Sequence, residues 1–152
     1  MNIDTTKLDN ILNNFLAPFE CQAMLGEDFA YWISDSTITY ALLVSDRHED
    51  TFLKFVKDLF PEINADIFLW SLLHELGHNE TNDDFDNEEH QEYRNFINQQ
   101  DITEEEYYSC PIELAATLWA GEYIQNHVNE ITRLWEQIAA AIQEIYITCK
   151  IR

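Results

Sequence analysis

The stretch Leu73-His74-Glu75-Leu76-Gly77-His78 is the most informative part of the sequence for both fold and function. It follows the pattern H-E-x-x-H, in which two histidines are four positions apart. On a helix, residues at this spacing lie on one face, so His74 and His78 can direct both imidazoles at a single ion. Glu75 follows the first histidine directly, which places its carboxylate beside the ion rather than on it. The pattern therefore predicts a helix with His74 and His78 as metal ligands.

The same pattern is the short signature of zinc-dependent peptidases, in which the glutamate acts as general base toward a water on zinc. Residues 65–73, which lead into it, are mostly apolar and contain no glycine or proline, as expected for a buried helix of about 65–79. Two histidines four apart can also cap or line a helix end, and five-residue matches occur by chance. The apolar lead-in favours a Zn²⁺ site, with Glu75 as the catalytic residue.

Composition limits the class of protein. The chain of 152 residues predicts one domain, residues 1–152, and its 46% hydrophobic content is enough for a core. Twenty-nine acidic residues and eight basic ones give a formal net charge of -21. A surface of this charge repels phosphate backbones and attracts basic partners, so direct nucleic-acid binding is not expected.

The cysteines and the hydropathy indicate a cytoplasmic protein. Cys21, Cys110 and Cys149 are widely spaced and odd in number, which is typical of reduced thiols rather than of a disulfide framework. The first residues show no basic segment followed by an apolar one, so no signal peptide is expected. No apolar run approaches the length of a membrane span, so no membrane association is expected.

The remaining periodicity predicts mostly helices and one hairpin. Two strands are expected at 29–33 and 37–44, where β-branched and aromatic residues gather on either side of a turn. This predicted hairpin either offers an edge strand on which an extended peptide could lie or simply covers the helical core. Helices are expected from the apolar spacing at 4–16, 52–59, 90–99, 101–108, 110–125 and 130–149, and a second short turn or helix at 19–25.

Two polar segments are expected to be loops. Residues 45–50 are charged, and His48 within them is expected to be a solvated surface residue. Residues 80–90 are acidic and lack aliphatic side chains, and they do not match the glycine and ligand period of an EF-hand calcium loop. Both segments are therefore interpreted as solvated connections.

A catalytic zinc site needs a third protein ligand in addition to the histidine pair. Glu113 is the preferred candidate, because it lies in the first turn of an apolar helix rich in alanine that can pack closely on the motif helix. A role for Glu113 in helix capping, three positions after Cys110, is the alternative. Other carboxylates and one imidazole downstream are further candidates: Asp84, Asp86, His90 and Glu92.

Residues 73–78, together with the later pattern Glu113-x-x-Ala116-x-x-Trp119-Ala120, resemble the ImmA/IrrE-type metallopeptidases. The resemblance covers the central third of the chain and the following helix, and it differs from the family pattern at Thr117 and Trp119. It implies an α+β, mostly helical, minimal zincin-like domain, with a small antiparallel sheet or hairpin packed on the motif helix. It also implies His74, His78 and Glu113 on zinc, and Glu75 as base.

The function expected from these patterns is zinc-dependent hydrolysis of peptide bonds in a protein or peptide substrate. Members of the resembled family are bacterial or mobile-element proteins, and several cleave repressor-type transcription regulators, which suggests that substrate class here. Residues of suitable type to stabilise an oxyanion are Tyr107, Tyr108, Tyr123 and His127. The alternative is an acidic inhibitor or DNA mimic of the anti-restriction type, with a structural or vestigial zinc site.

Overall fold

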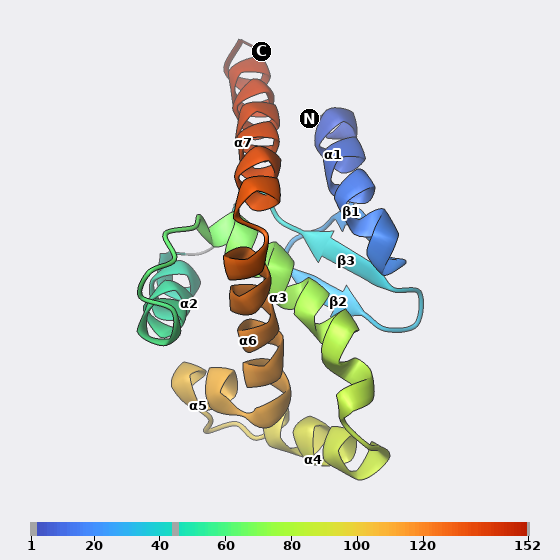
Figure 1. The fold of residues 1–152 in the computed structure, drawn as a ribbon, viewed down its shortest axis with the longest axis vertical. Helices are drawn as coiled ribbons and strands as arrows, with labels where there is room; N and C mark the ends of the chain where they lie inside the picture. The colour runs from blue at the N-terminus through green and yellow to red at the C-terminus, as the bar shows by residue number, and fades with distance from the viewer. Residues whose placement is uncertain (1–2, 44–45, 152) are drawn as a thin grey trace. The chain divides into compact units, whose positions relative to one another are not determined.

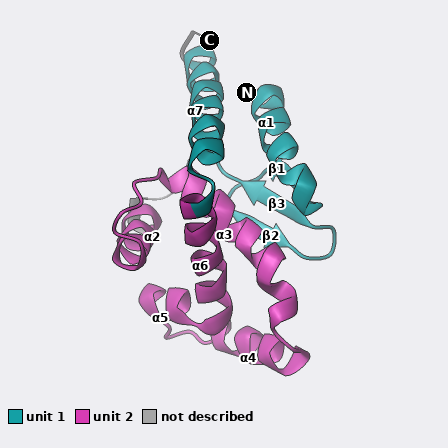
Figure 2. Cartoon of the chain, in the orientation of Figure 1, with its two compact units in different colours: residues 1–43, 126–152 teal, residues 44–125 magenta. Residues whose placement is uncertain are grey.

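A computed structural model describes residues 3–43 and 46–151 of the chain (Figure 1). The protein is mostly helical with one small mixed sheet, which confirms the predicted α+β class. The chain forms two compact units, shown in Figure 2: Met1–Leu43 with Asn126–Arg152, and Val44–Gln125. We call these unit 1 and unit 2 and describe each by itself. That the chain is one domain, and that the sheet packs on the motif helix, stay predictions.

Unit 1 holds the sheet. Its strands β1 (Gln22–Leu25), β2 (Ala30–Trp32) and β3 (Thr37–Tyr40) lie in the order β1-β3-β2. The antiparallel pairing of β2 with β3 confirms the predicted hairpin, with Tyr31 opposite Ile38. The sheet is not purely antiparallel, because β1 pairs with β3 in parallel. β1 also corrects the turn or helix expected at 19–25: only η1 (Ala17–Phe19) is helical there, and the chain is extended from Gln22 onward.

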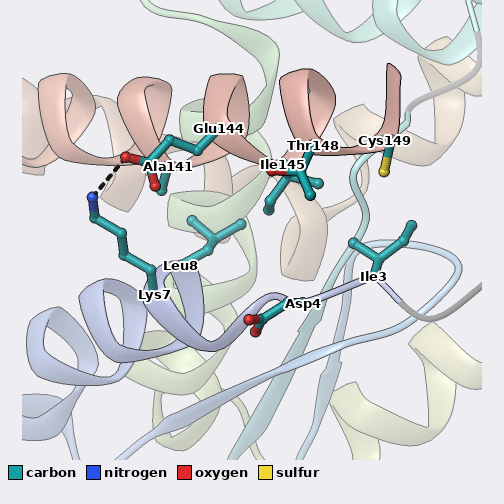
Figure 3. Close-up of a pocket in the computed structure, with 9 residues that line it drawn as sticks. All are labelled: Ile3, Asp4, Lys7, Leu8, Ala141, Glu144, Ile145, Thr148 and Cys149. Atoms are coloured by element: carbon teal, nitrogen blue, oxygen red, sulfur yellow. Dashed lines mark hydrogen bonds and ion pairs between the residues drawn. The ribbon is translucent and has the colours of Figure 1, made fainter. Parts of the chain in front are cut away.

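Two helices complete unit 1. Helix α1 (Thr6–Leu16) buries Leu8, Leu12 and Leu16, a spacing of four that places them on one face. Helix α7 (Val128–Ile151) buries apolar residues at intervals of three, four and seven along its length. A groove of about 200 Å³ runs between residues 3–8 and α7, with Leu8 and Ile145 among its lining and the Lys7–Glu144 ion pair of 3.1 Å across it (Figure 3).

Unit 2 contains the motif helix and the helices around it. They are α2 (Asp46–Leu59), α3 (Ile67–Thr81), η2 (Asn82–Asp84), α4 (Asn87–Ile97), α5 (Glu104–Ser109) and α6 (Pro111–Asn126), whose last residue falls in unit 1. Helix α3 is preceded by its N-cap, Asp66, whose side chain accepts a hydrogen bond of 2.8 Å from the Phe68 amide. Its residues 67–74 are buried without interruption, so α3 is the central helix of the unit.

Both segments expected to be loops are largely helical. Helix α2 begins at Asp46, so most of the predicted loop at 45–50 is its first turn; Ser45 lies outside the described residues. In the acidic segment 80–90, α3 continues to Thr81, η2 follows, and α4 begins at Asn87. Charge misled the prediction because α4 is stabilised locally: Asp86 and Glu89 form a capping box with bonds of 2.8 and 3.1 Å.

Helices α3 and α6 approach each other as closely as two backbones can. A Cβ atom built on Gly77 would lie 2.9 Å from the Cα of Ala116, well inside van der Waals contact. Glycine is therefore required at this position of α3, and the expectation that small residues of α6 allow close approach is confirmed. The contact matters because it sets the distance between the histidines of α3 and the first turn of α6.

We expect Gly77→Ala to destabilise the protein by about 1–3 kcal/mol, the usual cost of an added group in a packed interface. The obstacle is backbone, which cannot rotate away, so the two helices have to separate. Gly26→Ala is the control, because its Cβ would meet only the Thr39 side chain, at 3.1 Å. Urea denaturation of both variants checks this, and equal midpoints would contradict the close approach of α3 and α6.

Among the described residues, no helix combines the length and the apolar character that a membrane crossing requires.

Candidate metal centre

Three potential metal ligands meet inside unit 2. The Nε2 atoms of His74 and His78 lie 2.9 and 3.1 Å from the Oε1 atom of Glu113. One donor atom from each side chain lies within 4.8 Å of the other two. Glu113 is only 1% exposed and His74 only 7%. A carboxylate this deeply buried needs partners, and it has them in the two imidazoles.

The local fold explains why these residues meet. The four-residue spacing on α3 places the two imidazole rings side by side, with ring centroids 4.8 Å apart. Glu113 projects from the first turn of α6, three residues before Ala116, whose backbone rests against Gly77. The motif predicted from sequence and its preferred third ligand are therefore brought together by one helix–helix contact.

The electrostatics of the cluster follow from this geometry. Burial pushes the pKa of Glu113 upward, but its hydrogen bonds to His74 and His78 outweigh burial and hold that pKa well below the usual range. Burial also pushes the pKa of His78 down, but the hydrogen bond and charge of Glu113 together raise it above the ordinary value. Glu113 is thus a carboxylate anion at neutral pH, the form that binds a cation.

His74 is oriented by a hydrogen bond on the other side of its ring. Its Nδ1 atom lies 2.9 Å from the hydroxyl of Thr117, and both groups are buried. That hydroxyl has one proton, which it donates to the main-chain oxygen of Glu113 at 3.2 Å. Thr117 therefore accepts a hydrogen bond from Nδ1–H, so Nε2, which hydrogen-bonds to Glu113 in this structure, is the nitrogen whose lone pair would become available to a metal ion.

Tyr93 of α4 also reaches the cluster. Its hydroxyl donates a hydrogen bond to Oε2 of Glu113, the carboxylate oxygen that does not face the imidazoles. Burial first, and the charge of Glu113 second, raise the pKa of Tyr93 above its ordinary value, so the hydroxyl keeps its proton. Each oxygen of Glu113 therefore has its own set of partners.

Glu75 lies next to the cluster and is partly buried. Burial raises its pKa above the ordinary value; the two histidines oppose this shift and the charge of Glu113 adds to it. Glu75 is therefore within electrostatic range of the predicted ligands without being one of the three converging donors. This is the arrangement expected of a proton acceptor beside a metal site.

The other candidates for the third ligand are not in the cluster. Asp86 caps α4, and the Nε2 atom of His90 contacts the main-chain oxygen of Asn82 at 3.0 Å. Asp84 and Glu92 are exposed. Of the candidates named from sequence, Glu113 alone joins the two histidines within the described residues.

Of the four residues suggested as oxyanion donors, Tyr107 lies near the metal-ligand cluster, whereas contacts elsewhere are found for Tyr108 and Tyr123. The side chain of Tyr107 interacts with Tyr93 and Glu113, so it lies near the cluster. The Tyr108 hydroxyl instead contacts Nδ1 of His48 at 2.9 Å, and Tyr123 stacks on Trp119. His127 belongs to unit 1.

His48 is not the solvated surface residue that the sequence suggested. Besides its contact with Tyr108, its ring stacks on Phe52 with centroids 5.8 Å apart, and Phe52 in turn meets His74 edge-on. The charged neighbours of His48 in the sequence gave no indication of this, because adjacent positions of a helix point about 100° apart.

Two supporting residues, Tyr93 and Thr117, were not identified as part of the site from sequence. Tyr93 lies within the helix expected at 90–99 and was not singled out, and Thr117 was noted only as a difference from the family pattern. A signal for Thr117 existed: it lies four residues after Glu113 on α6, hence on the same face. For Tyr93 the sequence holds no comparable signal, because α4 meets α6 only through the tertiary fold.

We expect Thr117→Val to weaken zinc binding by about 10–100-fold, the usual effect of losing a partner that orients a ligand. Valine keeps the shape but gives Nδ1–H no acceptor, so the ring and its tautomer are no longer fixed. Thr81→Val is the matched control: this buried hydroxyl donates 2.8 Å to the Gly77 carbonyl and touches no ligand. Competition with a chromophoric chelator checks this, and equal affinities of the two variants would argue against an orienting role.

His74, His78 and Glu113 form a buried group that can hold a metal ion. In a tetrahedral zinc site with bonds of about 2.0–2.1 Å, donor atoms are roughly 3.3 Å apart. The separations of 2.9 and 3.1 Å between the imidazole nitrogens and the carboxylate oxygen are close to that value. Two nitrogens and one oxygen also match the donor set of known catalytic zinc sites.

Comparisons with protein-family models, with curated proteins and with solved structures find no significant match to this chain.

Proposed function

We propose that the protein is a zinc-dependent metallopeptidase. The observation that carries this proposal is the convergence of His74, His78 and Glu113 on one buried point, with Glu75 beside them. An H-E-x-x-H helix with a third potential ligand, a carboxylate, from a second helix is an arrangement that capping does not explain. In a capping role the Glu113 side chain would turn back to its own helix end, whereas its oxygens contact groups from α3 and α4.

Zinc is the metal that fits these donors best. Two imidazoles and one carboxylate are a common catalytic zinc set, and the imidazoles disfavour magnesium and calcium, which prefer oxygen ligands. Three protein ligands leave one position for water or substrate, which distinguishes a catalytic site from a closed structural one.

The residues of the chain then have separate roles in peptide hydrolysis. Bound zinc supplies a Lewis acid that polarises a carbonyl and lowers the pKa of a water molecule to about 7. The carboxylate of Glu75 accepts the proton of the attacking water and passes it to the nitrogen of the leaving amine. Thr117 fixes a proton of His74 on Nδ1, so that Nε2 is the nitrogen available to the metal, and Tyr107 is close enough to Glu113 to be the candidate donor to an oxyanion.

We propose a protein or peptide substrate rather than a nucleic acid. The formal charge of -21 opposes the approach of phosphate backbones and favours basic segments of protein. A repressor-type regulator, the substrate class suggested by the resemblance to the ImmA/IrrE-type peptidases, meets this condition because DNA-binding proteins carry basic surfaces. The free cysteines Cys21, Cys110 and Cys149 support a cytoplasmic setting.

The test is zinc-dependent cleavage. The protein is co-expressed with repressors encoded beside its gene, and new peptide termini are identified by mass spectrometry, with a variant lacking His74 as the control. Termini that appear only with the intact site support the peptidase. Stoichiometric binding of a nucleic-acid-binding protein without cleavage, unchanged when zinc is removed, would support the acidic mimic instead.

A further inference from the structure

Glu113 is held by different groups at its two oxygens. Oε1 faces the Nε2 atoms of both histidines, whereas Oε2 accepts the hydrogen bond from Tyr93. A carboxylate can bind a metal through one oxygen or through both. Which mode it adopts depends on what else its oxygens bind, and here Tyr93 engages one of the two lone pairs of Oε2.

The binding mode decides whether the site is open. Two imidazoles and one carboxylate oxygen make three protein donors and leave a fourth position for water or substrate. Two imidazoles and both oxygens make four donors, which is the count of a closed, structural zinc site. A hydrogen bond that weakens one oxygen as a metal ligand favours the first of these two arrangements, in which the fourth position stays open.

From this geometry we infer that Tyr93 is a positioning residue: it restricts Glu113 to metal binding through Oε1 and so keeps one coordination position open. The inference rests on the proposed zinc site and adds to it a residue outside the H-E-x-x-H motif. Tyr93 acts through Glu113 rather than on the metal or the substrate.

The surrounding structure is built to deliver this hydroxyl. Tyr93 comes from α4, whose start is fixed by the Asp86–Glu89 capping box. A second tyrosine, Tyr107 of α5, hydrogen-bonds with Tyr93, and α5 has its own capping box between Thr103 and Glu106. Each of these short polar helices thus contributes a tyrosine that interacts with Glu113, Tyr93 from α4 and Tyr107 from α5.

The experiment compares Tyr93→Phe with wild type after loading each with Co²⁺, whose visible absorption is strong in four-coordinate sites and weaker at higher coordination. Zinc K-edge absorption spectra give the coordination number directly. We expect Tyr93→Phe to show weaker cobalt absorption and one more oxygen neighbour at zinc than wild type. We also expect it to bind zinc about 10–100-fold more weakly, because the carboxylate is no longer oriented.

Tyr40→Phe is the matched control. The Tyr40 hydroxyl is also buried and also donates to a carboxylate, Oδ1 of Asp9 at 2.6 Å, but it lies in unit 1. It should lose a similar amount of stability in urea denaturation while keeping the wild-type cobalt spectrum. This comparison separates the effect on the metal from the general cost of removing a tyrosine hydroxyl.

The outcomes are distinct. A Tyr93→Phe spectrum identical to that of wild type overturns the inference, even if zinc affinity falls, because a merely structural role would do the same. A wild type that binds zinc but cleaves nothing removes the peptidase proposal, and the spectra still decide the role of Tyr93. A wild type that binds neither metal overturns both.

Discussion

Replacing His74 or His78 by alanine should abolish stoichiometric zinc binding. Each change leaves one imidazole and one carboxylate, and two protein donors rarely hold zinc against water. The loss should exceed the roughly 10–100-fold that removal of an outer partner causes. Elemental analysis of protein purified in parallel, followed by titration with zinc and a competing chelator, measures it directly.

His90→Ala is the control for this pair. It is a histidine of the same unit and was a candidate ligand from sequence, but it contacts the Asn82 carbonyl and not the cluster. It should retain full zinc content. Equal zinc in His74→Ala, His90→Ala and wild type would remove the proposed site altogether.

Glu113→Ala extends the same measurement to the third ligand. If Glu113 binds the metal, zinc affinity drops along with that of the histidine variants. If it only caps α6, zinc content stays normal and the variant loses about 1 kcal/mol of stability. The contacts of Oε1 with both imidazoles lead us to expect the first result.

The sequence was informative where one local rule decides the geometry. The i, i+4 spacing was enough to place His74 and His78 on one face, and the small residues of the later helix indicated where a third ligand would come close. The hairpin of β2 and β3 was likewise predictable from β-branched and aromatic residues on either side of a turn. In each case the residues that form the structure are neighbours along the chain or belong to one periodic pattern.

The prediction failed where charge outweighed a local signal and, for one strand, where a tertiary contact decides the structure. The segment around Glu88 and Glu89 was interpreted as a loop because of its charge, yet its capping box starts helix α4. This helix carries Tyr93, which reaches Glu113. β1 was missed because a strand of four residues has no periodicity of its own and exists through pairing with β3. His48 was judged by its neighbours in the chain rather than by Phe52 one turn away.

Glu75→Gln should leave a folded protein with normal zinc content and no measurable hydrolysis. Adjacent residues of a helix point about 100° apart, so Glu75 cannot join His74 on the metal, and it is absent from the group of converging donors. The amide keeps the size and most of the hydrogen bonding of the carboxylate but cannot accept a proton. Loss of a general base alone costs about 10²–10⁴ in rate.

The matched control is Glu80→Gln, the same change on an exposed residue of the same helix, whose carboxylate accepts a hydrogen bond from the side chain of its neighbour Asn79. With a cleaved protein identified by mass spectrometry as substrate, single-turnover rates are measured for both variants at equal zinc occupancy. Glu80→Gln should match wild type. If Glu75→Gln also hydrolyses at the wild-type rate, proton transfer has to be assigned to another group near the metal, and Tyr107 would be the first to test. If Glu75→Gln instead loses its zinc, Glu75 is itself a ligand, and the site has four protein donors and a structural role.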